Sequence, residues 1–332
     1  MRTLKKQRST LKLPPEIILL IIHYLPTESV LSFTLTCRLF YISFFPKSLI
    51  LSPLSKSISL TMLERDIPYL LYCPECITLH SWQRFSRPGG LLAIHSKRPC
   101  SKTAFRPPFI CGKITYQHIR LVMNHHLYGD SHGLPVHTLS ESRHWQCGAT
   151  GVDFQYSRQA RIINNNLFLI TNQTMHHPTN DTIQFEKYLR VDGGRICYHR
   201  NIWDTPRYYS SISQLTGSSK LHDKHPPLIS LPKFLMDAQC GRILSCPVCL
   251  TDAQVSIKWS NKFKRWSVEM VAWRQFGDCR SPFDLQWESM TIPGSEGPTE
   301  ELRAQEHPPG IVRYRWSKGD TKLSDMNSYF VG

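Results

Sequence analysis

The chain has 332 residues, of which 41% are hydrophobic and 8 are tryptophan, so it can form about two domains with a hydrophobic core. The net charge of +15 and an isoelectric point of about 9.4 favour anionic partners, such as nucleic acid, acidic membranes or acidic protein surfaces, without choosing among them. The first 12 residues contain no apolar core, so we expect no secretory signal. The 11 cysteines should then be reduced thiols in the cytoplasm or nucleus, which excludes a disulfide framework.

Residues 1–12 form a basic segment that we expect to be a disordered tail. A role in nuclear localisation is the alternative to a simple solvated tail. The basic residues are Arg2, Lys5, Lys6, Arg8 and Lys12.

The segment 13–50 predicts three short helices. Its Leu-Pro-Pro-Glu entry suits a first helical turn, where proline loses no hydrogen bond and glutamate meets the positive end of the helix dipole. Pro26 should end the first helix, Thr27 or Ser29 can cap the second, and Thr36 can cap the third.

The first of these helices is apolar around its whole circumference, which predicts burial on two sides. Three short helices cannot bury that surface among themselves, so we expect one face to pack internally and the other to dock on another protein. A buried helical hairpin of a larger domain is the alternative. A transmembrane segment is excluded, since about 20 uninterrupted apolar residues are needed. The interrupting residues are Glu16, His23, Pro26, Glu28 and Arg38.

Three motifs in this segment, Leu-Pro-x-Glu-Ile, Ile-x-x-Tyr-Leu and Thr-Cys-Arg-x-Phe-Tyr, together resemble an F-box. The resemblance covers about a tenth of the chain. It implies a helical module that binds the Skp adaptor subunit of a cullin–RING ubiquitin ligase. The expected packing and docking residues, with Pro14 and Ile17 nearest the adaptor, are Leu13, Pro14, Ile17, Ile21, Leu25, Leu31, Leu35, Cys37 and Phe40.

Residues 51–71 should contain a linker helix, which we place at Ser57–Leu70 and expect Pro68 to end. A Cys73-x-x-Cys76 pair follows at once, and it puts two thiols on one turn. Zinc is held by four such ligands in a tetrahedron.

His80 and Cys100 can complete a zinc site with this cysteine pair, so a structural zinc ion is a possible cofactor at the start of the next domain. Ile77 departs from the glycine that many zinc knuckles have after the second cysteine. Buried, reduced cysteines of a β-rich core are the alternative.

Residues 72–290 predict a β-rich domain, and residues 291–332 a linker with a C-terminal tail. Thr115 can cap a helix that stops at Gly129, and strands dominate after it. The predicted fold is therefore α+β: a small three-helix module, a linker helix and a domain of antiparallel hairpins. The predicted hairpins pair Arg161–Ile163 with Leu167–Ile170, Lys187–Val191 with Arg195–Tyr198, and Gln254–Trp259 with Arg265–Trp273.

A second cysteine pair, Cys246-Pro-Val-Cys249, has Cys240 and Cys279 nearby. Its looser ligand spacing favours core cysteines over a metal site. The two pairs lie too far apart in the sequence for an ordinary zinc ribbon, although they can meet in space.

The residues 258–266 alternate basic and aromatic side chains. Such a hairpin can stack nucleobases and neutralise phosphates. The same pattern arises when tryptophans face a core and lysines protect a sheet edge, and we favour this interpretation. No signature of a catalytic site is present, so we expect no catalytic residues and no enzyme activity.

Five further motifs are spread over most of the chain: Leu63–Asp66, Cys73–His80, Ser245–Asp252, Trp273–Gly277 and Pro282–Trp287. With the F-box-like segment, they resemble the F-box proteins of filamentous fungi, a family whose substrates are generally unknown. We therefore expect a substrate receptor of an SCF-type ligase, whose partners are the Skp adaptor, a cullin through it, and an unknown protein substrate. The alternatives are a nucleic-acid-binding or zinc-stabilised interaction protein and, more weakly, an enzyme with an unrecognised site, and no membrane partner is expected.

Overall fold

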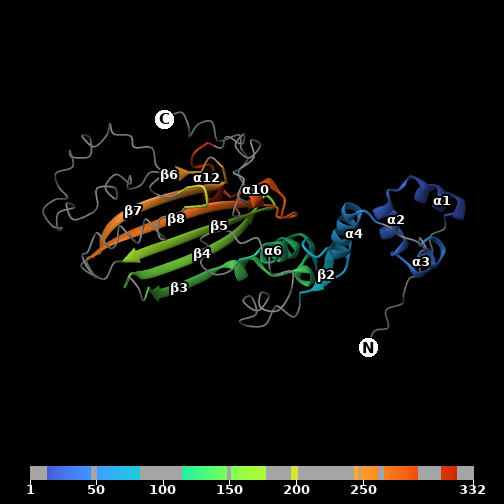
Figure 1. The fold of residues 1–332 in the computed structure, drawn as a ribbon, viewed down its shortest axis with the longest axis horizontal. Helices are drawn as coiled ribbons and strands as arrows, with labels where there is room; N and C mark the ends of the chain where they lie inside the picture. Colours follow the sequence, from blue (N-terminus) through green and yellow to red (C-terminus); the bar gives the residue numbers. More distant parts are fainter. Residues whose placement is uncertain are drawn as a thin grey trace. The chain divides into compact units, whose positions relative to one another are not determined.

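Short helices lead the chain and an antiparallel sheet follows, which confirms the predicted α+β fold (Figure 1). The computed structural model divides into two units, residues 1–81 and residues 82–332. The structure describes residues 13–45, 51–82, 114–147, 151–176, 196–200, 243–246, 248–260, 265–290 and 308–319.

The first unit begins with α1 (Pro15–Tyr24), α2 (Thr27–Thr34) and α3 (Arg38–Phe44). Pro26 keeps the preceding residue extended, so α1 stops, and α2 starts directly after this proline without a side-chain cap. The predicted caps were therefore wrong. The cap of α3 is Cys37, whose Sγ accepts a hydrogen bond from the backbone N–H of Phe40 at 3.5 Å.

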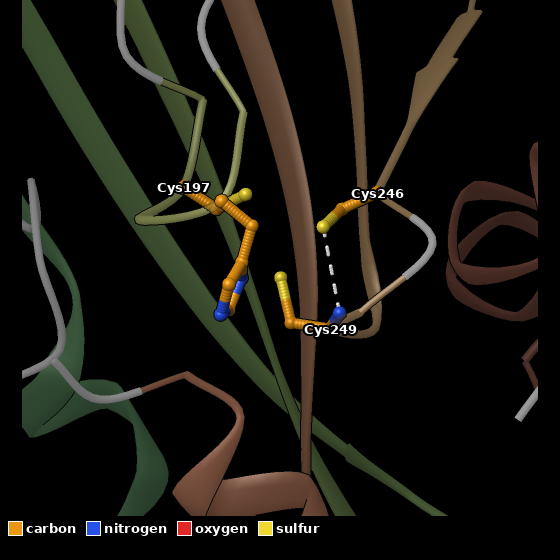
Figure 2. Close-up of side chains that lie close together, drawn as sticks. Cys197, Cys246 and Cys249 are labelled. Atoms are coloured by element: carbon orange, nitrogen blue, oxygen red, sulfur yellow. Dashed lines mark hydrogen bonds between the residues drawn. The ribbon is translucent and has the colours of Figure 1, made fainter. Parts of the chain in front are cut away.

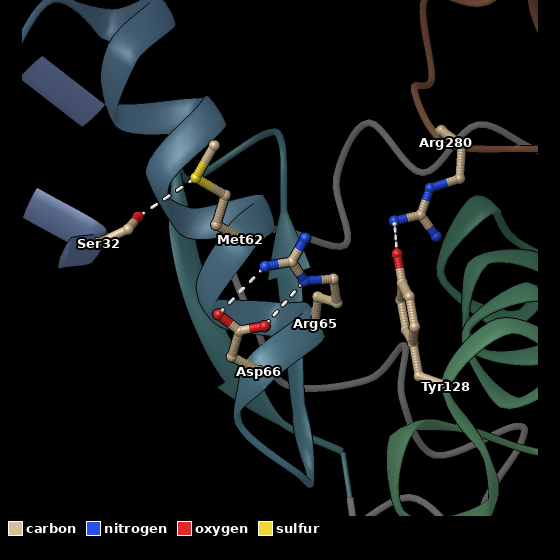
Figure 3. A network of polar contacts seen from close by, with 6 residues as sticks. All are labelled: Ser32, Met62, Arg65, Asp66, Tyr128 and Arg280. Carbon is tan, nitrogen blue, oxygen red and sulfur yellow. Dashed lines mark hydrogen bonds and ion pairs between the residues drawn. The ribbon is translucent and has the colours of Figure 1, made fainter. Parts of the chain in front are cut away.

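The linker helix α4 (Pro53–Asp66) starts and ends four residues earlier than predicted, because Ser52 caps it and Pro53 fits its first turn. The short hairpin of β1 (Leu70–Cys73) and β2 (Thr78–Ser81) follows. Hydrogen bonds tie α4 to its neighbours. Ser32 of α2 donates to the Met62 sulfur at 3.2 Å (Figure 3), and the buried Glu64 accepts from the Tyr72 N–H at 3.1 Å.

The second unit is built on a six-stranded antiparallel sheet with the order β3-β4-β5-β8-β7-β6. Its strands are β3 (Glu141–Gln146), β4 (Asp153–Ile163), β5 (Asn166–His176), β6 (Ile243–Ser245), β7 (Thr251–Ser260) and β8 (Arg265–Gly277). Asn164 and Asn165, with φ of 48° and 58°, form the two-residue turn between β4 and β5. The primed turn of a hairpin needs positive φ at both positions, which asparagine tolerates.

Helices cover one end of this sheet. As predicted, α6 (Tyr116–Tyr128) starts after Thr115 and stops at Gly129, whose φ is 91°. It contributes Ile119, Val122 and Met123 to a core that also holds residues from β5, β8 and the short helix α10 (Leu285–Glu288). Two short 3₁₀ turns, Asp130–His132 and Val136–Leu139, connect α6 to the first strand.

The predicted C-terminal tail contains a helix at residues 311–318 that was not predicted from the sequence. This helix, α12 (Ile311–Lys318), packs on β7 and β8. Its Ile311, Val312 and Trp316 are buried in the same core as α6. The carboxylate of Asp252, on β7, holds the first turn of this helix, an interaction that no local sequence pattern reveals.

The other predicted hairpins have mixed outcomes. The pairing of β7 with β8 confirms the last one, with Trp259 opposite Trp266. Residues 187–195 lie outside the described part of the chain, and Ile196–Tyr198 form bends rather than the predicted strand. Among the described residues, no helix is both long and apolar enough to cross a bilayer.

Candidate functional site

The helices α1 and α3 expose large apolar side chains. On α1, Ile17, Leu20, Ile21 and Tyr24 recur at the spacing of one helical face, and all four are exposed. Tyr24 is 79% exposed. An apolar stripe of this kind normally packs against a partner, since scattered single apolar residues are common on surfaces but contiguous patches are not.

The second exposed group lies on α3, where Leu39 and Ile42 are 68% and 70% exposed. Tyr41 is exposed beside them. We refer to the residues Leu13, Ile17, Leu20, Ile21, Tyr24, Leu39, Tyr41 and Ile42 as the apolar face of the first unit.

The residues predicted from the sequence divide into two groups. Leu31 and Phe40 are buried, and Phe40 stacks on Phe33 with ring centroids 4.7 Å apart, so they hold the three helices together. Leu25 is half-buried. The remaining predicted residues are exposed: Leu13, Pro14, Ile17, Ile21, Leu35 and Cys37. Five members of the apolar face were not among the predicted docking residues: Leu20, Tyr24, Leu39, Tyr41 and Ile42.

Residues 10–49 match the family model described as F-box-like. This range includes α1, α2 and α3, so an F-box-like domain occupies the start of the chain. Comparison with curated proteins found no match, and comparison with solved structures found none either. F-box domains bind the Skp adaptor and through it a cullin, and the F-box-like domain fits this general role.

After the F-box-like domain, the hairpin of β1 and β2 brings together three of the predicted metal ligands. The ligand atoms of Cys73, Cys76 and His80 lie within 4.8 Å of one another, and Cys76 Sγ is 2.9 Å from His80 Nε2. Burial raises the pKa of the Cys73 thiol to about 12. Cys100, the fourth predicted ligand, lies outside the described residues.

Ile77, which stands where many zinc knuckles have glycine, has an unusual backbone conformation. Its φ is 48°, in the left-handed region where glycine is the usual residue. A β-branched residue in this conformation is a true outlier, so the surrounding turn must hold it there. The turn after Cys76 therefore adopts the conformation that a glycine would favour, although the residue is isoleucine.

The second cysteine pair lies in the other unit and forms a separate cluster. The ligand atoms of Cys197, His199, Cys246 and Cys249 all lie within 4.8 Å of one another. Figure 2 shows the three cysteines of this cluster. The predicted companions differ: Cys240 lies outside the described residues, and Cys279 instead donates to the Phe276 carbonyl at 3.3 Å.

Hydrogen bonds among these thiols separate their pKa values. The bond with Cys197, and then the bond with Cys249, lower the pKa of Cys246, whereas the bond with Cys246 raises that of Cys197 to about 12. Burial raises the pKa of Cys249. Cys246 is therefore the thiol most readily ionised.

Sequence reasoning missed Cys197 and His199, which lie about 50 residues before the second pair. The available signal was the short Cys-x-His pattern itself, a pair of ligand types two positions apart.

The basic hairpin at 258–266 forms the predicted strands, but the side chains from 257 to 266 lie outside the described part, so the nucleic-acid interpretation stays a prediction.

Proposed function

We propose that this protein is the substrate receptor of an SCF-type ubiquitin ligase. The observation that carries the proposal is the apolar face of the F-box-like domain, which lies on α1 and α3. Leu31 and Phe40 are already buried between the helices, so the exposed residues are in excess of what the module needs for its own packing. The occupant that fits is the Skp adaptor, because F-box domains in general bind it and residues 10–49 match the F-box-like model.

The ubiquitin transfer would then be carried out by other subunits. The receptor contributes geometry: it holds a substrate close to the loaded conjugating enzyme, which raises the effective concentration of the substrate lysines. We assign substrate binding to the second unit, whose sheet is large and independent of the F-box-like domain. The complex would act in the cytoplasm or nucleus.

Adaptor binding tests the proposal directly. The full chain is co-expressed with the Skp adaptor and purified, and the amount of adaptor that co-purifies is compared with that of a variant carrying Leu13→Ala, Ile17→Ala and Ile21→Ala. We expect a loss of at least tenfold, since each removes exposed apolar area that the complex would bury. The control is Leu54→Ala on α4, which is 71% exposed but lies outside the apolar face.

Circular dichroism of each variant checks that the fold is kept. Equal recovery of the adaptor with the triple variant and with wild type would refute the proposal. Loss with Leu54→Ala to the same degree would show non-specific apolar association instead of a docking face.

A further inference from the structure

Two turns that are far apart in the sequence meet in the second unit. Cys197 and His199 belong to the bends at 196–200, and Cys246 and Cys249 belong to the connection from β6 to β7. The three cysteine side chains point toward one another (Figure 2). All three thiols are buried, and none is in a disulfide.

The ligand types and distances fit one metal. Zinc with Zn–S bonds near ~2.3 Å places the sulfurs of a tetrahedron about 3.8 Å apart. All four ligand atoms lie within 4.8 Å of one another, so no pair exceeds this edge length by more than about 1 Å. Three sulfurs and one imidazole nitrogen are also the soft and borderline donors that zinc prefers over calcium or magnesium.

We propose that Cys197, His199, Cys246 and Cys249 hold a structural zinc ion. All four positions of the tetrahedron are then occupied by the protein, which leaves no place for a reactive water molecule. The ion would hold the 196–200 turn against the β6–β7 connection. This inference is independent of the proposed ligase function.

Two details of the cluster support a metal over ordinary core packing. His199 Nδ1 is buried and has no hydrogen-bond partner among the described residues, which is costly unless another interaction satisfies it. The backbone N–H groups of Val248 and Cys249 both point at Cys246 Sγ, at 3.4 Å each. Such donors stabilise a thiolate, the form that binds a metal.

Cys279 shows what an ordinary core cysteine looks like in the same unit. It is fully buried, and its thiol donates to the carbonyls of Phe276 and Gly277 at 3.3 and 3.7 Å. Backbone carbonyls alone accept the hydrogen bonds of this thiol. The four-residue cluster differs because its ligand atoms face one another.

The sheet positions both turns in advance. Arg274 of β8 is buried and donates to the Ile196 carbonyl and to Thr171 Oγ1, at 2.8 Å each. The N–H of Gln275, the next residue, donates to the Leu250 carbonyl at 3.0 Å. Neighbouring residues of one strand therefore hold the two turns, so the ligands are arranged before a metal binds.

Zinc content tests the proposal. The full chain is purified in the Cys73→Ser background, which removes the other candidate site, and zinc is measured by inductively coupled plasma mass spectrometry. We expect about one zinc ion per chain. His199→Ala should lose most of it, His199→Cys should retain it because four cysteines also form a zinc site, and Cys279→Ser should leave it unchanged.

Cobalt provides a second measurement on the chain that keeps all four ligands. Cobalt-loaded Cys73→Ser protein should show the visible absorption of a tetrahedral thiolate site, even if His199→Ala proves unstable. A folded Cys73→Ser chain with negligible zinc and no cobalt spectrum overturns the proposal. Equal zinc loss in His199→Ala and Cys279→Ser also overturns it, since metal would then depend on core packing in general.

Discussion

The carboxylate of Asp252 accepts a hydrogen bond from the backbone N–H of Arg313 at 2.9 Å and another from the N–H of Gly310 at 3.2 Å. These N–H groups at the start of α12 have no acceptor within the helix, and Asp252 comes from the beginning of β7, the strand next to the β6 edge of the sheet. A strand residue thus acts as the cap of a helix nearly 60 residues later in the chain. The helix dipole adds to the attraction, because its positive end faces the carboxylate.

We predict that Asp252→Ala loosens α12 from the sheet. The substitution leaves the Arg313 N–H without its acceptor, which should cost about 1–2 kcal/mol, whereas the Gly310 N–H keeps Ser245 Oγ as an acceptor at 3.0 Å. Hydrogen–deuterium exchange of peptides covering 308–319 measures this as faster exchange. Asp252→Asn, which keeps one acceptor oxygen, should show a smaller effect, and equal exchange in all three proteins would contradict the prediction.

Phe40→Ala and Ile17→Ala should separate stability from adaptor binding. Phe40 is buried against Phe33, so its truncation should destabilise the F-box-like domain by about 3 kcal/mol. Ile17 is 42% exposed, so its truncation should cost less than about 0.5 kcal/mol of stability while still weakening adaptor binding. Thermal unfolding measures the stability of each variant, and adaptor titration of the same samples measures its binding. A stability loss as large for Ile17→Ala as for Phe40→Ala would show that the apolar face is part of the core.

Cys73→Ser should lower the zinc content of the full chain. The cluster of Cys73, Cys76 and His80 offers three ligands on one hairpin, and removal of a thiolate leaves too few to hold the metal tightly. Zinc analysis of wild type and variant measures the difference. Thr78→Ala is the matched control, because Thr78 lies beside Cys76 Sγ at 3.2 Å but is no thiolate. Equal zinc in wild type and Cys73→Ser would end this idea.

Arg280 anchors α6, and we predict that Arg280→Ala destabilises the second unit more than Tyr128→Phe does. The guanidinium donates to the Tyr128 hydroxyl at 2.9 Å (Figure 3) and to Asn124 Oδ1 at 2.8 Å. Tyr128→Phe removes one of these bonds, at about 1 kcal/mol, and Arg280→Ala removes both, at about 2 kcal/mol. Urea unfolding followed by tryptophan fluorescence measures the free energy of unfolding of both variants. A larger loss for Tyr128→Phe than for Arg280→Ala would refute the prediction.

Local sequence determined much of this fold. The proline-bounded helices of the F-box-like domain, the Asn164–Asn165 turn and the helix from Thr115 to Gly129 all depend on residues within a few positions of one another. Backbone sterics and hydrogen bonding act at that range, so periodicity and turn chemistry predict such elements. The apolar excess of residues 13–45 could also be seen from composition alone.

Only the tertiary structure decided which of those apolar residues face outward, since Leu31 and Leu35 look alike in the sequence yet one is buried and the other exposed. It also decided that His199 lies beside Cys246, and that a predicted tail forms α12 on Asp252. Each of these depends on side chains brought together from distant segments by the pairing of strands. No pattern within a single segment contains that information, because the contact exists only once the sheet has formed.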